Sequence, residues 1–301
     1  MPEGSARETG VLFDGFGMGE SPRWHDSRLW FSNWSTDEIV AVDLDGNSEV
    51  MGRGGGGAGW ATNWLPGGRM LITGSELVRV EPDGSRVRYA DLSDISVYGS
   101  SEITVDGRGN VYLNSINFDF ANFNDVLVSG AAPGRIALVT PDGRSREVAD
   151  GLAFPNGMVV TPDNRTLIVA ESFARRLTAF DIGADGSLTN RRVWAAVTGD
   201  GICLDADGAV WTSEVAPGDA GVCMRVHEGC EVLDRIELDR PCYASCWAAT
   251  MAGHCSWWWR SVRPGPHRRA AAGEDGSDPD HSRRCTARRL AVTLCVQARP
   301  D

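Results

Sequence analysis

Short runs of alternating apolar and polar residues recur along the chain, in pairs joined by turns rich in Asp, Asn, Gly and Pro. Five such pairs cover residues 24–32, 64–72, 105–113, 161–169 and 204–212. An alternation of period two places one face of each run against a core, and the turn residues tolerate the backbone of a tight hairpin. The pattern therefore predicts five β-hairpins.

A second pair of strands is expected after each hairpin. Three of these pairs close on an Asp-Gly turn, in residues 39–46, 77–84 and 136–143. Four strands per unit, with units spaced roughly 40–55 residues apart, are typical of the blades of a β-propeller. A β-sandwich is the alternative, but it would not repeat the same hairpin chemistry five times. We expect an all-β propeller.

The composition narrows the class of protein. No apolar run reaches the ~18 residues of a membrane span, and the polar N-terminal residues 1–10 lack the apolar stretch of a secretory signal. The net charge of −12 argues against a nucleic-acid partner on electrostatic grounds. We therefore expect a cytoplasmic protein that binds neither membrane nor nucleic acid. The oligomeric state is not predicted.

Charge and composition change abruptly near residue 245. The chain contains no Lys, and residues 245–301 hold nine Arg against five acidic residues, a net charge of +4, which leaves −16 for residues 1–244. The same stretch holds four of the eight Cys and three of the five His. We expect residues 1–244 to form the propeller and residues 245–301 to be a segment of another kind.

Three short segments stand apart from the repeat. They read Gly-Glu-Ser-Pro-Arg-Trp from residue 19, Ala-Phe-Pro-Asn-Gly-Met from residue 153 and Gly-Asp-Gly-Ile-Cys-Leu-Asp from residue 199. Each places an oxygen-bearing side chain, Glu20, Asn156 or Asp200, at the start of an innermost strand. Taken singly, Glu20 reads as a solvated charge and Asn156 as a turn residue. Together they suit Ca²⁺ or Mg²⁺ and tolerate Mn²⁺ or Zn²⁺.

These segments resemble the senescence-marker-protein/gluconolactonase family, which includes regucalcin. The resemblance covers roughly residues 11–244. It implies a six-bladed β-propeller, of which residues 1–244 supply five blades and the start of the sixth. It also implies that Glu20, Asn156 and Asp200 hold one divalent metal ion, with Ca²⁺ expected first and Zn²⁺, Mn²⁺ or Mg²⁺ as alternatives. The implied activity is hydrolysis of a small sugar-type lactone.

The chain departs from the family pattern at one place. The family commonly has an Asn-Asp pair entering the third blade with an Arg just upstream, whereas this chain reads Gly-Ser-Ser-Glu-Ile from residue 99. Ser101 and Glu102 are therefore candidate substrate contacts. Asn114 and Asn117, which follow on the next strand, are further candidates. Because the upstream Arg is missing, the substrate of another family member is not transferred to this chain.

Lactone opening requires a polarised carbonyl, an activated water and stabilisation of an oxyanion, and a bound dication serves these needs. We expect Asp200 to accept the proton of the water while it touches the metal. Other chemistries are weakly supported. No Gly-x-Ser-x-Gly motif occurs, and His25 and His227 are the only His before residue 245, so a Ser-His-Asp triad is not expected. Residues 52–57 are Gly-rich but lack the Lys of a phosphate loop.

The unusual sequence after residue 245 can be explained by a shift in the reading frame. Its Cys and His residues do not form two metal-binding pairs. If the last base of each codon is joined to the first two of the next, residues 246–247 must read Leu and residues 257–259 Val-Val. The recovered pattern can be Leu-Leu-Gly-Gly-Asp-Asp-Gly-Arg-Thr-Leu-Phe-Met-Val-Val-Ala, which parallels residues 161–170. We hypothesise a one-base frameshift near Ala244 or Ser245 that disrupts the sixth blade and leaves residues 245–301 disordered or poorly packed.

The sequence thus predicts a metal-dependent lactonase whose partner is a small-molecule lactone. Two alternatives remain at this level. One is a non-catalytic, calcium-binding regulatory propeller of the regucalcin kind. The other is an inactive product of a frameshifted gene.

Overall fold

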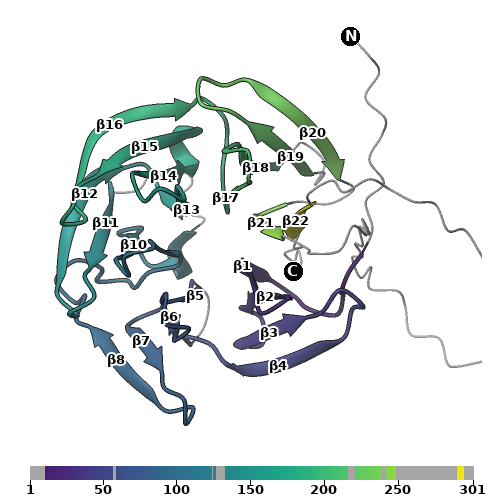
Figure 1. Ribbon diagram of the computed structural model, residues 1–301, viewed down its shortest axis with the longest axis vertical. Coiled ribbons are helices and arrows are strands. Elements are labelled where there is room, and N and C mark those ends of the chain that lie inside the picture. The colour runs from purple at the N-terminus through teal and green to yellow at the C-terminus, as the bar shows by residue number, and fades with distance from the viewer. Residues whose placement is uncertain are drawn as a thin grey trace, which may run out of the picture.

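Antiparallel four-stranded sheets follow one another around a central axis (Figure 1). This computed structural model describes residues 11–56, 59–123, 125–126, 133–215, 221–238, 242–248 and 290–294. Within these ranges the chain forms five four-stranded sheets, in each of which the strands pair in sequence order. The predicted all-β propeller is therefore confirmed, with five complete blades.

Each blade runs from an innermost strand at the axis to an outermost strand at the rim (Figure 1). The first two blades contain β1 (Gly19–His25), β2 (Arg28–Asn33), β3 (Glu38–Val42), β4 (Ser48–Arg53), β5 (Thr62–Trp64), β6 (Met70–Ile72), β7 (Leu77–Val80) and β8 (Arg86–Ala90). The third and fourth contain β9 (Ile103–Val105), β10 (Val111–Ser115), β11 (Gly134–Val139), β12 (Ser145–Leu152), β13 (Pro155–Val160), β14 (Thr166–Glu171), β15 (Arg176–Ile182) and β16 (Leu188–Ala195). The fifth contains β17 (Cys203–Leu204), β18 (Val210–Val215), β19 (Gly221–Val226) and β20 (Val232–Leu238).

The hairpins form where the turn chemistry predicts them. In the first blade, Asp26 and Ser27 have φ values of 47° and 61°, the left-handed backbone that a two-residue hairpin turn requires. Trp24 then pairs with Leu29 across that turn. The four other predicted hairpins correspond to β5–β6, β9–β10, β13–β14 and β17–β18.

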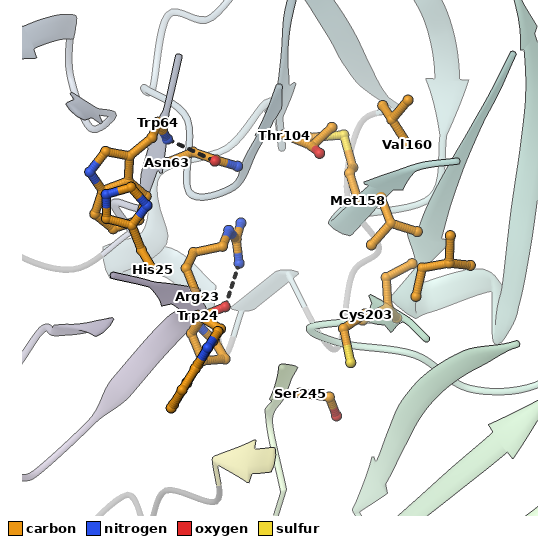
Figure 2. Close-up of a pocket in the computed structure, with 14 residues that line it drawn as sticks. Arg23, Trp24, His25, Asn63, Trp64, Thr104, Met158, Val160, Cys203 and Ser245 are labelled. Atoms are coloured by element: carbon orange, nitrogen blue, oxygen red, sulfur yellow. Dashed lines mark hydrogen bonds between the residues drawn. The ribbon is translucent and has the colours of Figure 1, made fainter. Parts of the chain in front are cut away.

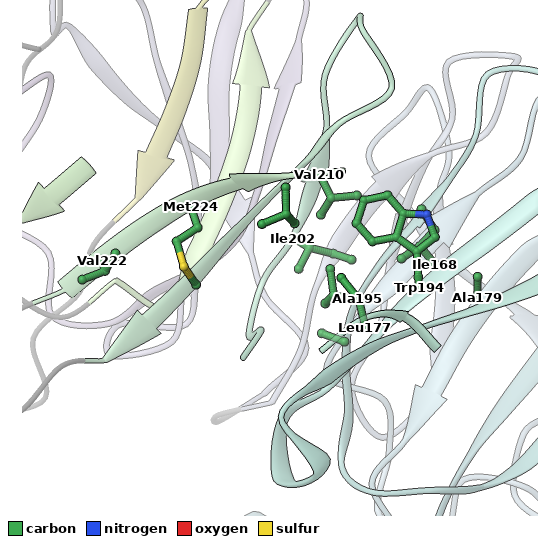
Figure 3. Close-up of a cluster of buried hydrophobic side chains, with 11 residues drawn as sticks. Ile168, Leu177, Ala179, Trp194, Ala195, Ile202, Val210, Val222 and Met224 are labelled. Carbon is green, nitrogen blue, oxygen red and sulfur yellow. The ribbon is translucent and has the colours of Figure 1, made fainter. Parts of the chain in front are cut away.

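Apolar side chains fill the spaces between neighbouring blades. Between the fourth and fifth blades, Trp194 and Leu177 pack with Ile202 and Val210 (Figure 3). Equivalent clusters lie between the first and second blades, the second and third, and the third and fourth. Burial of this surface, worth about 25 cal/mol per Å², holds the innermost strands in place around the axis.

A two-stranded sheet lies between the fifth blade and the first (Figure 1). It consists of β21 (Ala244–Ala248) and β22 (Leu290–Leu294), and β21 packs against β1, β17 and β18. The start of the segment after residue 245 is thus a strand rather than an irregular tail. The other predicted features of residues 249–289 and 295–301 lie outside the described residues. A complete sixth blade stays a prediction.

Helices are short in the described part of the chain. They include two 3₁₀ turns, η1 (Phe120–Asn122) and η2 (Ser172–Ala174), and residues 123 and 125–126 are α-helical. No helix within the described ranges has the length and apolar character needed to cross a membrane.

Candidate functional site

The innermost strands bring four polar side chains to one mouth of the ring. Glu20 is the second residue of β1, and Asn156 is the second residue of β13. Glu102 lies directly before β9, and Asp200 lies three residues before β17. Because the innermost strands of successive blades run in the same direction along the axis, their starting ends meet at the same mouth.

Local irregularities turn these side chains toward the axis. The pairing of β1 with β2 shifts register between Glu20 and Arg23, where Ser21 has a φ of 52°. The pairing of β13 with β14 shifts in the same way between Pro155 and Met158, on either side of Asn156. A β-bulge bends the strand and re-aims its side chains. The two predicted ligands therefore occupy equivalent bulges in two blades.

Gly157 allows the fourth and fifth blades to approach closely beside these ligands. Its N–H donates to the backbone carbonyl of Asp200 at 3.0 Å. A Cβ at this position would lie 2.5 Å from that carbonyl oxygen and 2.5 Å from the nitrogen of Ile202, which is too close for any residue but glycine. Gly157 is therefore needed for the close approach of β13 to the segment that carries Asp200, in addition to any preference of the Asn-Gly pair for a turn.

Asn156 and Asp200 are in direct contact. The amide nitrogen of Asn156 donates to Oδ1 of Asp200 at 2.5 Å. Burial and the charge of Glu102 raise the pKa of Asp200 to about 7, and the hydrogen bond from Asn156 opposes this rise. Burial, with the charges of Asp200 and Glu102, raises the pKa of Glu20 well above its usual range. Three carboxyl groups therefore repel one another in a water-poor site.

Arg23 supplies a positive charge to this cluster. Its Nη2 donates to Oε2 of Glu102 at 3.1 Å and to the carbonyl of Ile103 at 2.8 Å. Burial raises the pKa of Glu102, and the nearby guanidinium of Arg23 partly offsets that effect. Arg23 thus places a positive charge from the first blade beside the carboxylate that enters the third.

Asn114 fastens the third blade to the fourth. Its Oδ1 accepts the backbone N–H of Ser101 at 3.0 Å and that of Glu102 at 2.8 Å, and its Nδ2 donates to Ser101 Oγ at 2.9 Å and to the Pro155 carbonyl at 2.8 Å. The side chain is fully buried. Both lone pairs and both N–H groups are therefore in use, and Asn114 supports the site rather than facing a substrate.

Ser101 and Asn117 differ in their surroundings. The Ser101 hydroxyl is buried and bound to Asn114. Asn117 is half-buried in the loop after β10, with a φ of 61°, and its Nδ2 donates to the carbonyl of Pro133 at 3.2 Å. Of the four candidate substrate contacts, Glu102 is the one whose charge acts on the predicted metal ligands Glu20 and Asp200.

The turn between β14 and β15 ties together the two segments that carry Asn156 and Asp200. Glu171 accepts the N–H of Ala153 at 2.8 Å. Ser172 donates its N–H to the carbonyl of Phe154 at 3.1 Å and its hydroxyl to the carbonyl of Gly199 at 2.8 Å. One turn therefore fixes the residues just before both ligands.

The donor set fits a hard divalent cation. Carboxylate and amide oxygens are the ligands that Ca²⁺ and Mg²⁺ prefer, and Ser21 Oγ, fully buried beside Glu20, has no hydrogen-bond partner in the described part of the chain. No three His, Cys, Asp or Glu side chains within that part are arranged as a metal centre. The predicted ligands Glu20, Asn156 and Asp200 are a mixed set of two carboxylates and an amide, which is not a group of that kind.

Residues 18–252 match the family described as the SMP-30/gluconolactonase/LRE-like region. The chain belongs to this family. Diisopropyl-fluorophosphatase of Loligo vulgaris is 26% identical over 191 residues, which cover 56% of this chain and 60% of that protein. The chain thus matches less than two thirds of the length of this curated relative. Family membership confirms the resemblance carried by the three motifs.

Solved structures share the fold of this SMP-30/gluconolactonase-like chain. A gluconolactonase from Xanthomonas campestris aligns with a TM-score of 0.63 at 20% identity, over 79% of this chain and 82% of that one. A calcium-binding protein, regucalcin, from Agrobacterium tumefaciens aligns with a TM-score of 0.64 at 20% identity, over 80% and 81%. At this level of identity both comparisons speak for the propeller fold alone.

Sequence reasoning missed the supporting residues of the site. Arg23 stands within a recognised motif, but its partner Glu102 is 79 residues away. Asn114 is predicted from the sequence as a substrate contact, whereas in the structure its side chain binds Ser101, Glu102 and Pro155. Glu171 and Ser172 carry no motif, and their only local signal is the interruption between two predicted strands.

Proposed function

We propose that this SMP-30/gluconolactonase-like protein is a divalent-metal-dependent hydrolase that opens a small, sugar-type lactone. The observation that carries the proposal is the convergence of three carboxyl groups, the buried Glu20 and Glu102 and the half-buried Asp200, beside an amide at one mouth of the ring. Mutually repelling carboxyl groups favour the binding of a cation. The family and its gluconolactonase and phosphatase relatives support a hydrolase in general.

In this proposal Glu20, Asn156 and Asp200 hold the ion, with Ca²⁺ expected first because the ligands are oxygen atoms. A bound dication polarises a lactone carbonyl and acidifies an adjacent water. Asp200 would accept the proton of the attacking water. Its pKa of about 7 belongs to the site without a cation, and an ion bound beside it would lower that pKa and keep the group a carboxylate. Asn156 donates to Asp200 and thereby fixes the orientation of its carboxylate.

The substrate side of the site is proposed to include Glu102 and Asn117. Glu102 is held by Arg23 and by the backbone contacts of Asn114. Asn117 lies on the loop that follows β10. We further propose that the partner is a small molecule rather than a nucleic acid, because the net charge of −12 repels phosphates.

We also propose that the ring has six blades. Five are complete in the described residues, and β21 with β22 takes the position between the fifth blade and the first. The one-base frameshift near Ala244 or Ser245 would explain why the sixth repeat is not written in the sequence. An inactive product of a damaged gene is then one outcome of any assay on this chain.

The experiment is lactone hydrolysis by the purified chain and by a frame-restored chain, each with chelator and after return of Ca²⁺, Zn²⁺, Mn²⁺ or Mg²⁺. Turnover that chelation abolishes and one metal restores supports the lactonase. Metal binding measured by calorimetry without turnover on any lactone supports a calcium-binding regulatory propeller instead. Turnover in the restored chain alone identifies the chain as written as the inactive product of a frameshifted gene.

A further inference from the structure

A cavity lies on the axis toward the opposite ends of the innermost strands. It has a volume of about 450 Å³, within the range of pockets that hold small organic ligands. Arg23, Trp24 and His25 line it from the last part of β1, and Asn63 and Trp64 from the end of β5. Glu20 is the second residue of β1 and Pro22 is the first lining residue on that strand, so a rise of about 3.3 Å per residue puts roughly 7 Å of strand between the predicted metal ligand and this cavity.

The walls of the cavity combine polar and apolar side chains, and the apolar ones are of two kinds. On one side the Trp64 ring stacks on His25, with centroids 4.1 Å apart and planes at 14°. On the other side lie Met158 and Val160 of β13, with Cys203 of β17 near them (Figure 2). The remaining lining residues are Pro22, Thr104, Val159, Ile202, Leu204 and Ser245. Flat rings face aliphatic side chains, an arrangement that accepts a planar apolar body.

The charge of the lining contrasts with that of the chain. The whole chain has a net charge of −12, yet no Asp or Glu is among the residues that line this cavity, and Arg23 is. Figure 2 shows the Arg23 side chain extending into the space between Trp64 and Met158. Arg23 is paired with Glu102, which does not line the cavity, so within the lining itself the guanidinium favours an anion over a cation.

Arg23 has donors left for such an anion. Its guanidinium has five N–H groups, and its hydrogen bonds in the described residues are three: Nη1 to the Pro22 carbonyl, and Nη2 to Glu102 and to the Ile103 carbonyl. The contact with Glu102 and the carbonyls fixes the plane of the guanidinium. A guanidinium held in this way presents its remaining N–H groups to a carboxylate at little entropic cost.

We propose that this cavity is a binding site for a small aromatic carboxylate, separate from the metal-binding mouth. The carboxylate would bind Arg23, and the ring would lie between Trp64 and the side chains of Met158 and Ile202. The proposal does not depend on the proposed lactonase activity.

The test is a calorimetric titration of the full chain with benzoate and with benzamide, its neutral isostere, in the presence of chelator. We expect benzoate to bind at least tenfold more tightly than benzamide. Arg23→Gln should abolish that preference, and Leu204→Trp, which fills the cavity from the other wall, should weaken both ligands. Equal affinities for the two ligands, or full benzoate binding by Leu204→Trp, would overturn the proposal.

Two controls keep the result interpretable. Thermal melts establish that each variant is folded, and Leu204→Trp carries the test if Arg23→Gln does not fold. Asp200→Asn alters the mouth and leaves the cavity untouched, so it should keep benzoate binding. Loss of benzoate binding in Asp200→Asn would place the carboxylate at the mouth and refute the second site.

Discussion

In the proposed mechanism Asp200 combines two roles, contact with the ion and acceptance of a proton. It lies against Asn156, and burial together with Glu102 raises its pKa to about 7. Asp200→Asn keeps the shape and removes the charge. We expect turnover to fall by about 10²–10⁴-fold and metal affinity to fall with it, as measured by lactone hydrolysis and by calorimetry with Ca²⁺.

Asp207→Asn is the matched control for that change. Asp207 lies in the same blade, on the turn after β17, with a largely exposed side chain paired to Arg225. An exposed ion pair contributes about 0–1 kcal/mol, so this variant should keep both turnover and metal affinity. Unchanged turnover in Asp200→Asn would remove Asp200 from the mechanism, and an equal loss in both variants would point to a general effect of charge.

Individual residues also mark the limit of what the sequence predicts. Glu20, Asn156 and Asp200 are predicted as ligands because each stands at the start of an innermost strand, a pattern visible in the sequence alone. Arg23 and Glu102 meet across 79 residues of sequence, and their contact depends on how two blades are placed around the axis. No local signal encodes that placement, so the support of the site could be read only from the structure.

At the level of elements, the turn η2 links the two ligand-bearing segments. The Ser172 hydroxyl donates to the carbonyl of Gly199, next to Asp200. Ser172→Ala should cost only about 1 kcal/mol of stability but should weaken Ca²⁺ binding several-fold, because Asp200 loses its anchor. Ser172→Thr retains a hydroxyl and should restore binding, and Ser187→Ala, on an exposed turn of the same blade, should have no effect.

That prediction is checked by Ca²⁺ calorimetry alongside thermal melts. A positioning role requires that affinity fall more than stability does in Ser172→Ala. If the two fall in proportion, or if Ser172→Thr behaves as Ser172→Ala does, the turn contributes to folding alone.

The end of β14 carries an ion-pair network that makes stability depend on pH. Burial disfavours the charged form of Glu171, but hydrogen bonds from Arg176, Thr178 and Ala153 outweigh burial and lower its pKa. Its contribution is therefore complete above the unfolded-state pKa of about 4.5 and is lost as pH falls through the lower folded-state pKa. Below about pH 5, the free energy of unfolding of the parent should fall more steeply than that of Glu171→Gln.

Urea unfolding between about pH 3 and pH 7 measures this difference. At neutral pH, Glu171→Gln should be less stable by about 3 kcal/mol, because it leaves Arg176 and Arg191 without their buried partner. Glu147→Gln, a partly exposed carboxylate on β12 paired with Arg135, is the control and should change little. Parallel pH profiles for the parent and Glu171→Gln would contradict the prediction.

The elements themselves were largely predictable. Each hairpin is predicted by the alternation of apolar and polar residues and by turn residues such as Asp26 and Ser27, whose left-handed backbone is a local property. The bulges at Glu20 and Asn156 were not predicted, since a bulge is set by pairing with the next strand. The sequence therefore locates the strands, whereas the direction of the predicted ligand side chains depends on how each strand pairs with its neighbour.

At the scale of the whole molecule, two apolar blade faces border the position of the two-stranded sheet. On the fifth blade, Trp211 and Ile236 pack with Cys203, Cys223, Leu238 and Cys242. On the first blade, Leu29 and Phe31 pack with Val40 and Val42, and Phe13, Phe16 and Tyr243 lie against them. Every other pair of neighbouring blades shares a cluster between two four-stranded sheets. The described residues supply two strands at this position.

A propeller gains stability when its last blade pairs with the ring, because closure covers sheet edges and apolar faces. Restoring the reading frame after Ala244 should complete the sixth blade between these two faces. We expect the restored chain to be more soluble than the chain as written, and to unfold in one sharp, reversible transition at a higher temperature. Scanning calorimetry of both chains, with a chain ending at Ala244 as control, measures the gain. If the chain as written already unfolds reversibly at the same temperature as the restored chain, then residues 245–301 close the ring themselves and the frameshift hypothesis is wrong.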